Sequence, residues 1–178
     1  VNVDVFDPNG NLIIPSGSLI PSGYQMFLNT SKNISDMRGG IDIYNKVQFL
    51  QTILQDTFGS KRVKLIETNR SVEDQDKLQL GGTSSNFLSW HNYGLGVKIL
   101  ITDDTNTNTI KEGTPDFMKL LDISEAFTIA CGNGDLGIPI NVVWCGRLKT
   151  GPDNFSWEFL PIGLDHKDSW KLRDSAYN

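Results

Sequence analysis

The stretch Ser89–Lys98 reads SWHNYGLGVK and combines a histidine, two glycines and a terminal lysine. Gly94 and Gly96 allow the backbone to turn tightly and to pass close to a neighbouring segment. The apolar run Val97–Ile101 then predicts a buried strand. The sequence thus places a histidine just before a central strand and a charged side chain inside that strand.

This stretch resembles the Ser-x-His-x-x-Gly-x-Ala-x-Asp signature of the zinc D,D-carboxypeptidases and L-alanyl-D-glutamate endopeptidases. It is most similar to the phage-endolysin branch, which commonly reads Ser-x-His-Asn-Tyr-Gly-Leu-Ala-Val-Asp. In that family the histidine and the aspartate are two of three zinc ligands. Ser89 and His91 match the signature here, whereas Lys98 stands at the position of the aspartate.

A second stretch, Asn69–Gln75, resembles the family's Tyr-Arg-Ser-x-x-Glu-Gln element. The resemblance implies that Arg70 and Gln75 face the substrate groove, where the arginine would hold an anionic part of the substrate. Ser71 is a suitable N-cap for a following helix. A planar guanidinium suits a neighbouring carboxylate equally well, so a purely structural ion pair of Arg70 stays open.

The stretch Val142–Phe159 resembles the family's Glu-Trp-Gly-Gly-Asp-Trp-Lys and Asp-x-Pro-His-Phe-Glu elements. Trp144 and Asp153 fall into place. Val143 stands where the family has its general-base glutamate, and Ser156 stands where it has its third zinc-ligating histidine. A second alignment puts Glu158 at that ligand position. We prefer the first alignment because it keeps the spacing from the tryptophan to the aspartate.

Zinc hydrolysis requires three protein ligands, an open position for water and a base. In the preferred alignment His91 is the one ligand that remains, and the Lys98 ammonium would repel a divalent cation by roughly several kcal/mol. We therefore expect no intact catalytic residue, no metal and no cofactor, and no rise in melting temperature with added zinc. We expect Lys98 to replace the ion's charge and to pair with one of three carboxylates, namely Glu67, Asp153 or Glu158. Hydrolysis by a Lys98 base and a Ser156 nucleophile is a minor alternative.

The composition fits one folded domain. The chain has 178 residues, of which 38% are apolar. Its net charge of −5 and pI near 4.9 disfavour nucleic-acid binding. We also expect no membrane span and no signal peptide. Cys131 and Cys145 lie in apolar contexts, which indicates two buried thiols. The alternative is a metal site formed by both cysteines together with His91.

The resemblance covers about residues 41–160 and implies an α+β fold. We expect a small antiparallel sheet with flanking helices, similar to the Hedgehog and D,D-peptidase fold. Residues 1–40 read as an extended N-terminal arm with one or two short strands, and residues 161–178 as a polar C-terminal tail in which His166 is solvated. Apolar spacing predicts a helix over 41–58, buried through Ile43, Val47, Leu50, Leu54 and Phe58.

A second helix is predicted to begin at Thr114 or Asp116 and to end at 132–134. Its expected buried side consists of Phe117, Leu120, Leu121, Ala126, Phe127 and Ala130. Strands are predicted over 63–68 and 96–102, followed by an exposed polar loop over 103–109. A final hairpin is predicted within 138–159.

These observations favour a catalytically inactive peptidase-like domain that serves as a structural or binding component of a phage virion, in the tail, baseplate or neck. Its partners would be other virion proteins or its own copies, contacted through the arm and the tail. It would be located in the virion and, during assembly, in the host cytoplasm. A peptidoglycan-binding groove would be formed by Arg70, Gln75, Ser89, Trp144 and Asp153. The alternatives are an active peptidoglycan endopeptidase or carboxypeptidase with an atypical site, and a non-viral pseudoenzyme.

Overall fold

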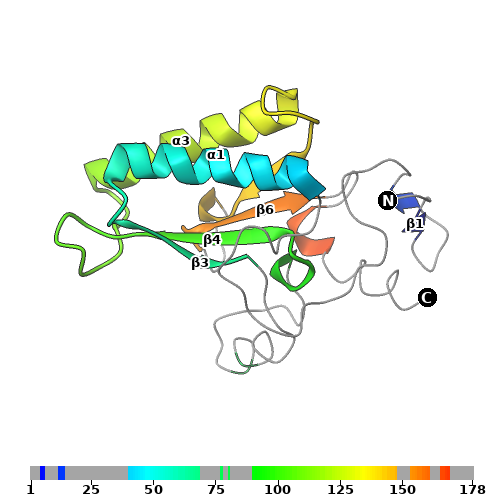
Figure 1. The fold of residues 1–178 in the computed structure, drawn as a ribbon. Coiled ribbons are helices and arrows are strands. Elements are labelled where there is room, and N and C mark those ends of the chain that lie inside the picture. Colours follow the sequence, from blue (N-terminus) through cyan, green and yellow to red (C-terminus); the bar gives the residue numbers. More distant parts are fainter. Residues whose placement is uncertain are drawn as a thin grey trace.

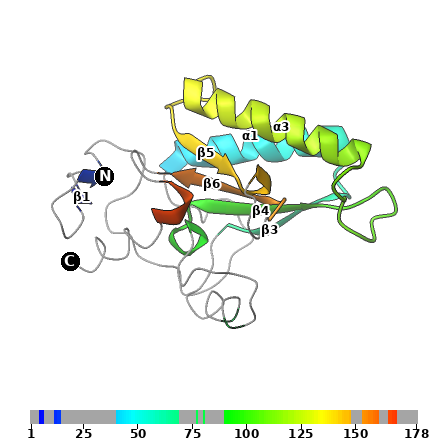
Figure 2. The same cartoon turned by 180° about the vertical axis from the view of Figure 1, so that it is seen from behind.

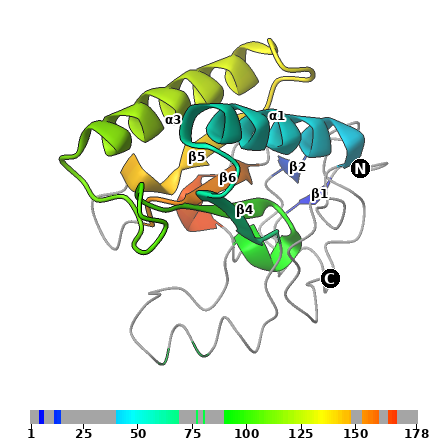
Figure 3. The same cartoon turned by 60° about the vertical axis from the view of Figure 1, so that its left-hand side comes forward.

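The computed structural model describes residues 5–6, 12–14, 40–68, 77, 80, 90–147, 153–160 and 165–168. In this part of the chain, two helices lie side by side over one face of a four-stranded sheet (Figure 1; Figure 3). The helices are α1 (Gly40–Phe58) and α3 (Pro115–Asn133). The strands are β3 (Val63–Glu67), β4 (Gly96–Ile101), β5 (Asn141–Trp144) and β6 (Ser156–Leu160).

The strands follow the order β3-β4-β6-β5, and every neighbouring pair is antiparallel. The predicted final hairpin is therefore confirmed: β5 pairs with β6, and β5 packs against α3 (Figure 2). The described residues also include the short 3-10 turns η2 (Trp90–Tyr93), η3 (Cys145–Arg147) and η4 (His166–Asp168). The expected α+β class with a small antiparallel sheet is confirmed.

Two short strands, β1 (Val5–Phe6) and β2 (Leu12–Ile14), pair with each other in a separate antiparallel sheet. They agree with the prediction of one or two short strands in residues 1–40. The rest of that segment and most of 161–178 lie outside the described residues. No helix in the described ranges is long and apolar enough to cross a bilayer.

The helix α1 forms as its apolar spacing predicts, and all five expected side chains are buried. The helix ends where Gly59 adopts a φ of 89°, and the Gly59 N–H donates to the carbonyl of Gln55 at 2.8 Å. A residue with a side chain is strained at this left-handed φ, which explains why the helix stops at a glycine.

The helix α3 begins with Thr114 as N-cap, whose hydroxyl accepts a hydrogen bond from the Phe117 N–H at 3.2 Å. It ends at Gly134, in the left-handed conformation. The prediction that Ala126 is buried is wrong, because that residue is exposed. The buried stripe alternates steps of three and four residues and consists of Phe117, Leu120, Ser124, Phe127 and Cys131. Ser124 is polar, so hydrophobicity alone did not place it in this stripe.

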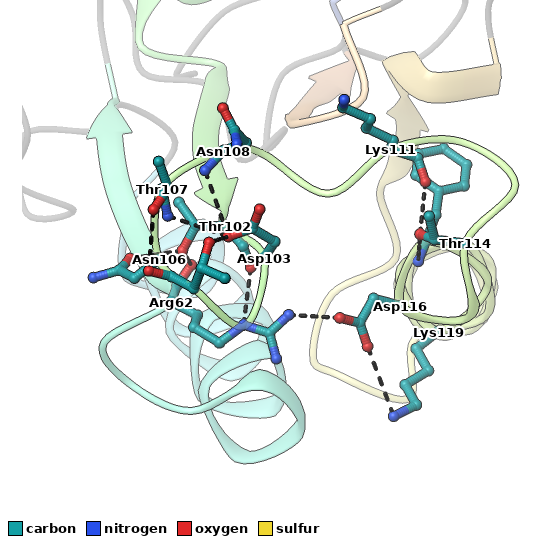
Figure 4. Close-up of polar contacts among 12 residues, drawn as sticks. Arg62, Thr102, Asp103, Asn106, Thr107, Asn108, Lys111, Thr114, Asp116 and Lys119 are labelled. Atoms are coloured by element: carbon teal, nitrogen blue, oxygen red, sulfur yellow. Dashed lines mark hydrogen bonds and ion pairs between the residues drawn. The ribbon is translucent and has the colours of Figure 1, made fainter.

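Arg62 ties one end of the sheet to the start of α3 (Figure 4). Its Nε donates to the Thr102 carbonyl at 2.9 Å, and its guanidinium also pairs with Asp116 at 2.6 Å. The loop after β4 is exposed as predicted, and the Asp103 carboxylate accepts hydrogen bonds from Thr105 and Thr107 within it. These contacts fix the end of β4 that lies farthest from Gly96.

The two faces of the sheet have different characters. The Trp157 indole donates to Ser124 of α3 at 3.2 Å, so this side chain points toward the helices. Successive strand residues point to opposite faces, which places Ser156 and Glu158 on the face away from the helices. Lys98 is paired with Ser156, and Gly96 with Glu158, so all four positions share that face. This second face carries the polar groups.

Candidate functional site

A row of polar residues crosses three strands on the face away from the helices. Glu67 of β3 is paired with Lys98 of β4, and Lys98 is paired with Ser156 of β6. The preferred sequence alignment assigns Lys98 and Ser156 to two ligand positions of the zinc peptidases, and the fold makes them direct neighbours. Directly opposed side chains on adjacent strands lie close enough to interact.

Asp153 contacts two side chains of this row, Lys98 and Ser156. Its Oδ2 lies 3.3 Å from the Lys98 Nζ and accepts a hydrogen bond from the Ser156 hydroxyl at 2.6 Å. Its Oδ1 accepts from the Phe155 N–H at 3.0 Å. Of the three carboxylates expected as partners of Lys98, the structure therefore supplies Asp153. We call Lys98, Asp153 and Ser156 the lysine cluster.

The contacts of the lysine cluster also set the charge of Asp153. Burial raises the pKa of this carboxyl, but the Lys98 ammonium, the Ser156 hydroxyl and the Phe155 N–H together outweigh burial and lower the pKa below its usual value. Asp153 is therefore held as a carboxylate, and the cluster contains a fixed pair of opposite charges.

His91 lies next to this row, in the η2 turn that leads into β4. It is 4% exposed, and its Nδ1 lies 3.1 Å from Oε1 of Glu67. The ring occupies the space where a side chain at position 96 would be, because a Cβ added to Gly96 would lie 2.8 Å from the His91 ring. The glycine in place of the family's alanine thus allows the imidazole to pack against bare backbone.

A second group of polar side chains surrounds Glu158, two residues farther along β6. Glu158 lies between Gly96 and Val143 in the sheet and is 2% exposed. The Cys145 thiol donates to Oε1 of this carboxylate at 3.1 Å, and the same oxygen contacts Nδ1 of His166. We call Cys145, Glu158 and His166 the cysteine cluster.

The prediction that His166 is a solvated histidine is wrong. Its side chain is 33% exposed and contacts the buried Glu158. The hydrogen bond that the His166 ring makes to the Glu158 carboxylate raises the pKa of His166, against the opposing effect of burial. The η4 turn is held in place because the Trp90 indole donates to the His166 carbonyl at 3.2 Å. Figure 1 shows η2 and η4 near each other, away from the helices.

Both cysteines and Trp144 have buried side chains. Cys131 and Cys145 are both buried, as expected. The surroundings of Cys145 are nevertheless not purely apolar, because the Glu158 carboxylate of the adjacent strand contacts its thiol. The residues next to Cys145 in sequence gave no sign of this carboxylate. Trp144 is 2% exposed, donates to the Asn154 carbonyl at 2.9 Å and lies 6.1 Å from the Phe117 ring, so it packs in the core.

The remaining predicted groove residues, Arg70, Gln75 and Ser89, lie outside the described residues. Val143, which stands at the position of the family's general base, is partly buried and paired with Glu158. Sequence reasoning considered Glu158 as a substitute ligand in the second alignment. It missed the combination with Cys145 and His166, because the three residues come from β6, η3 and η4 and share no local motif.

Comparison with solved structures shows the class of fold. The chain is similar to the L-Ala D-Glu endopeptidase ChiX of Serratia marcescens, with a TM-score of 0.50 and 16% identity over 72% of this chain and 84% of that one. It is also similar to the vancomycin-resistance D,D-dipeptidase VanXYg, solved with a D-Ala-D-Ala phosphinate analogue. For that structure the TM-score is 0.41 and the identity 12%, over 96% of this chain and 70% of that one.

The first similarity confirms the D,D-peptidase-like fold that the sequence motif implied. No protein-family model matches the chain, and no curated protein matches it either.

Proposed function

We propose that this chain is a peptidase-like domain without zinc-dependent hydrolysis at the family's metal position, which acts as a structural or binding component of a phage virion. The contact between Lys98 and Asp153 carries this proposal. The lysine stands where the resembling family has a metal-ligating aspartate, and its charge is already neutralised by a protein carboxylate. A cation held by the chain itself takes the place of the ion.

The other family positions support the same conclusion. A zinc ion needs donors with available lone pairs, and an ammonium has none. The Ser156 hydroxyl is hydrogen-bonded to Asp153, and the side chain of Val143 cannot accept a proton from water. Of the expected ligands, His91 alone is a good metal donor, and its Nδ1 faces Glu67. These residues do not fit the zinc ion of the family, so we derive no hydrolytic step through it.

A binding role uses the same face of the sheet. Lys98 and Asp153 keep 29% and 35% of their side chains exposed, so this charge pair is accessible to a polar ligand. We propose that the groove of the peptidase-like fold retains affinity for peptidoglycan, with Arg70, Gln75 and Ser89 contributing. The virion location, and partners contacted through residues 1–40 and 161–178, are proposed from the resemblance to phage endolysins.

An assay on purified full-length protein tests the proposal. We expect no release of muropeptides from peptidoglycan with or without added zinc, and co-sedimentation of the protein with insoluble peptidoglycan. Detection of the chain by mass spectrometry in purified virions of the encoding phage tests the location. Zinc-dependent release of muropeptides would contradict the proposed inactivity, and absence of the chain from the particles would contradict the virion role.

A second function, that of an active peptidoglycan endopeptidase with an atypical site, is favoured by the cysteine cluster. Cys145, Glu158 and His166 bring three metal-donor atoms together on the same face of the sheet. Hydrolysis that is abolished by His166→Asn and retained by His91→Asn would support this alternative. Hydrolysis with the reverse pattern would place the activity at the family's own position.

A further inference from the structure

We propose that Cys145, Glu158 and His166 form a binding site for a divalent transition metal of the zinc type, separate from the position that zinc occupies in the resembling family. This inference goes beyond the proposed function, because a metal bound here neither requires nor excludes hydrolysis. It also changes the expectation, drawn from the family positions alone, that zinc leaves the protein's stability unaffected.

The first argument is geometric. One donor atom from each of the three residues lies within 4.8 Å of the other two. Ligand atoms on a tetrahedral zinc ion are about 3 to 4 Å apart, given bond lengths of about 2.0 to 2.3 Å. The thiol and the imidazole both contact the same oxygen, Oε1 of Glu158. Three donors therefore point at one small volume, and a slight outward movement of the partly exposed His166 admits an ion.

The second argument is the chemistry of the donors. Thiolate, imidazole and carboxylate are all zinc ligands, and three protein ligands with an open fourth position are typical of zinc sites that bind water. The thiolate disfavours magnesium and calcium, which prefer oxygen donors. A divalent ion would also balance one thiolate and one carboxylate without residual charge. This balance matters because Glu158 is 2% exposed and Cys145 is 5% exposed.

The third argument is the support around the donors. The sheet fixes Glu158, since Gly96 and Val143 flank it on the neighbouring strands. The η4 turn that carries His166 is closed by a hydrogen bond from the Asp168 N–H to the Asp165 carbonyl at 3.0 Å. The Trp90 indole holds the His166 carbonyl. A central strand and a hydrogen-bonded turn thus position two of the three donors, as a metal site requires.

A cysteine-based catalytic triad fits these contacts less well. In such a triad the imidazole lies against the thiol and removes its proton, while the carboxylate orients the imidazole from the other side. Here the Cys145 thiol donates to the carboxylate itself. A neighbouring negative charge disfavours a thiolate unless a cation is present. A metal ion supplies that cation.

Metal binding by the full-length chain tests this proposal directly. The protein is treated with a chelator, dialysed and titrated with Zn²⁺ alone, and separately with Co²⁺. We expect about one ion per chain, a melting temperature that rises with zinc concentration, and the charge-transfer absorption of a cobalt–thiolate bond. Cys145→Ser should abolish that absorption.

The variants separate this site from the family position. Loss of an outer-shell partner typically costs a metal site about 10–100-fold in affinity, so Cys145→Ser and His166→Asn, which remove direct ligands, should cost more. His166 lies in a partly exposed turn, so its variant should fold. His91→Asn is the matched control and should leave zinc affinity unchanged. Absence of binding to the wild type, undiminished binding by both cluster variants, or loss of binding in His91→Asn would each overturn the proposal.

Discussion

Ser156 and Glu158 lie two residues apart on β6 and point to the same face of the sheet, yet their surroundings differ in charge. Ser156 belongs to the lysine cluster, where an ammonium and a carboxylate already neutralise each other. Glu158 belongs to the cysteine cluster, where the carboxylate is surrounded by a thiol and an imidazole. A shift of two residues along each strand separates a site that excludes cations from one suited to them.

This difference shows how a fold can keep its shape while the chemistry of its groove changes. The backbone pairing that places Lys98 beside Ser156 is the same pairing that places Gly96 beside Glu158. A few side-chain identities therefore decide whether either position attracts a metal. Function has to be argued from these side chains, because the fold alone does not specify it.

The largest expected effect is a gain of zinc binding at the family's position. In a Cys145→Ser background, Lys98→Asp combined with Val143→Glu and Ser156→His should bind zinc, since it supplies the ligands and the base that the family uses. In the same background Lys98→Asp alone should not bind zinc, because Ser156 remains a weak donor at the position of the third ligand and Val143 cannot act as the base. Zinc content after dialysis and release of muropeptides measure the result. Zinc binding by the single variant would show that the lysine alone blocks the site.

The second effect concerns the buried carboxylate. Glu158→Ala should lower the free energy of unfolding by about 3 kcal/mol in chelator, since it leaves the Cys145 and His166 donors without their acceptor. Urea denaturation measures the change. Glu125→Gln is the control, because the Glu125–Arg147 pair is exposed and should contribute at most about 1 kcal/mol. Equal effects of the two variants would argue against a special role for Glu158.

The third effect concerns the space beside His91. Gly96→Ala should destabilise the protein by about 1–3 kcal/mol, because the added Cβ overlaps the imidazole and forces it out of its position. Gly132→Ala in α3 is the matched control, since nothing lies within 4 Å of its added Cβ. That control should stabilise the helix by about 0.5–1 kcal/mol. A neutral result for Gly96→Ala would mean that His91 moves without cost.

The smallest effect is a pH dependence from the lysine cluster. The folded-state pKa of Asp153 is lower than its unfolded value, so its contribution to stability is fully present above the unfolded pKa of about 4 and is lost as pH falls through the folded pKa. Solvent screens the effect, since 35% of the side chain is exposed. The free energy of unfolding should therefore fall less on acidification in Asp153→Asn than in the wild type. Parallel pH profiles would contradict this assignment.

Local patterns predicted the elements of this fold well. The apolar spacing of α1, the N-cap Thr114 and the final hairpin all depend on residues close together in sequence. The motif around His91 also predicted the D,D-peptidase-like fold. Ala126 was misplaced because hydrophobicity was used without the strict helical phase, which instead selects Ser124.

The candidate sites were only partly predictable. The motif alignment brought together His91, Lys98 and Ser156; the sheet register makes Lys98 and Ser156 neighbours, and the His91 ring packs beside Gly96 of the same strand. The cysteine cluster depends on contacts between a strand, the turn before it and a segment after it. His166 reads as a polar tail residue in the sequence, and the buried carboxylate that it meets lies on an internal strand. Such contacts follow from tertiary packing and leave no periodic signal.

The two histidines of the chain are divided between these regions, His91 beside the lysine cluster and His166 inside the cysteine cluster. Each region therefore contains one imidazole whose proton NMR signals report on its surroundings. The imidazole proton signals of the unmodified protein should form two sets, one from a ring enclosed against backbone and one from a ring partly open to water. The set of imidazole signals that a ligand shifts therefore shows which of the two regions the ligand binds.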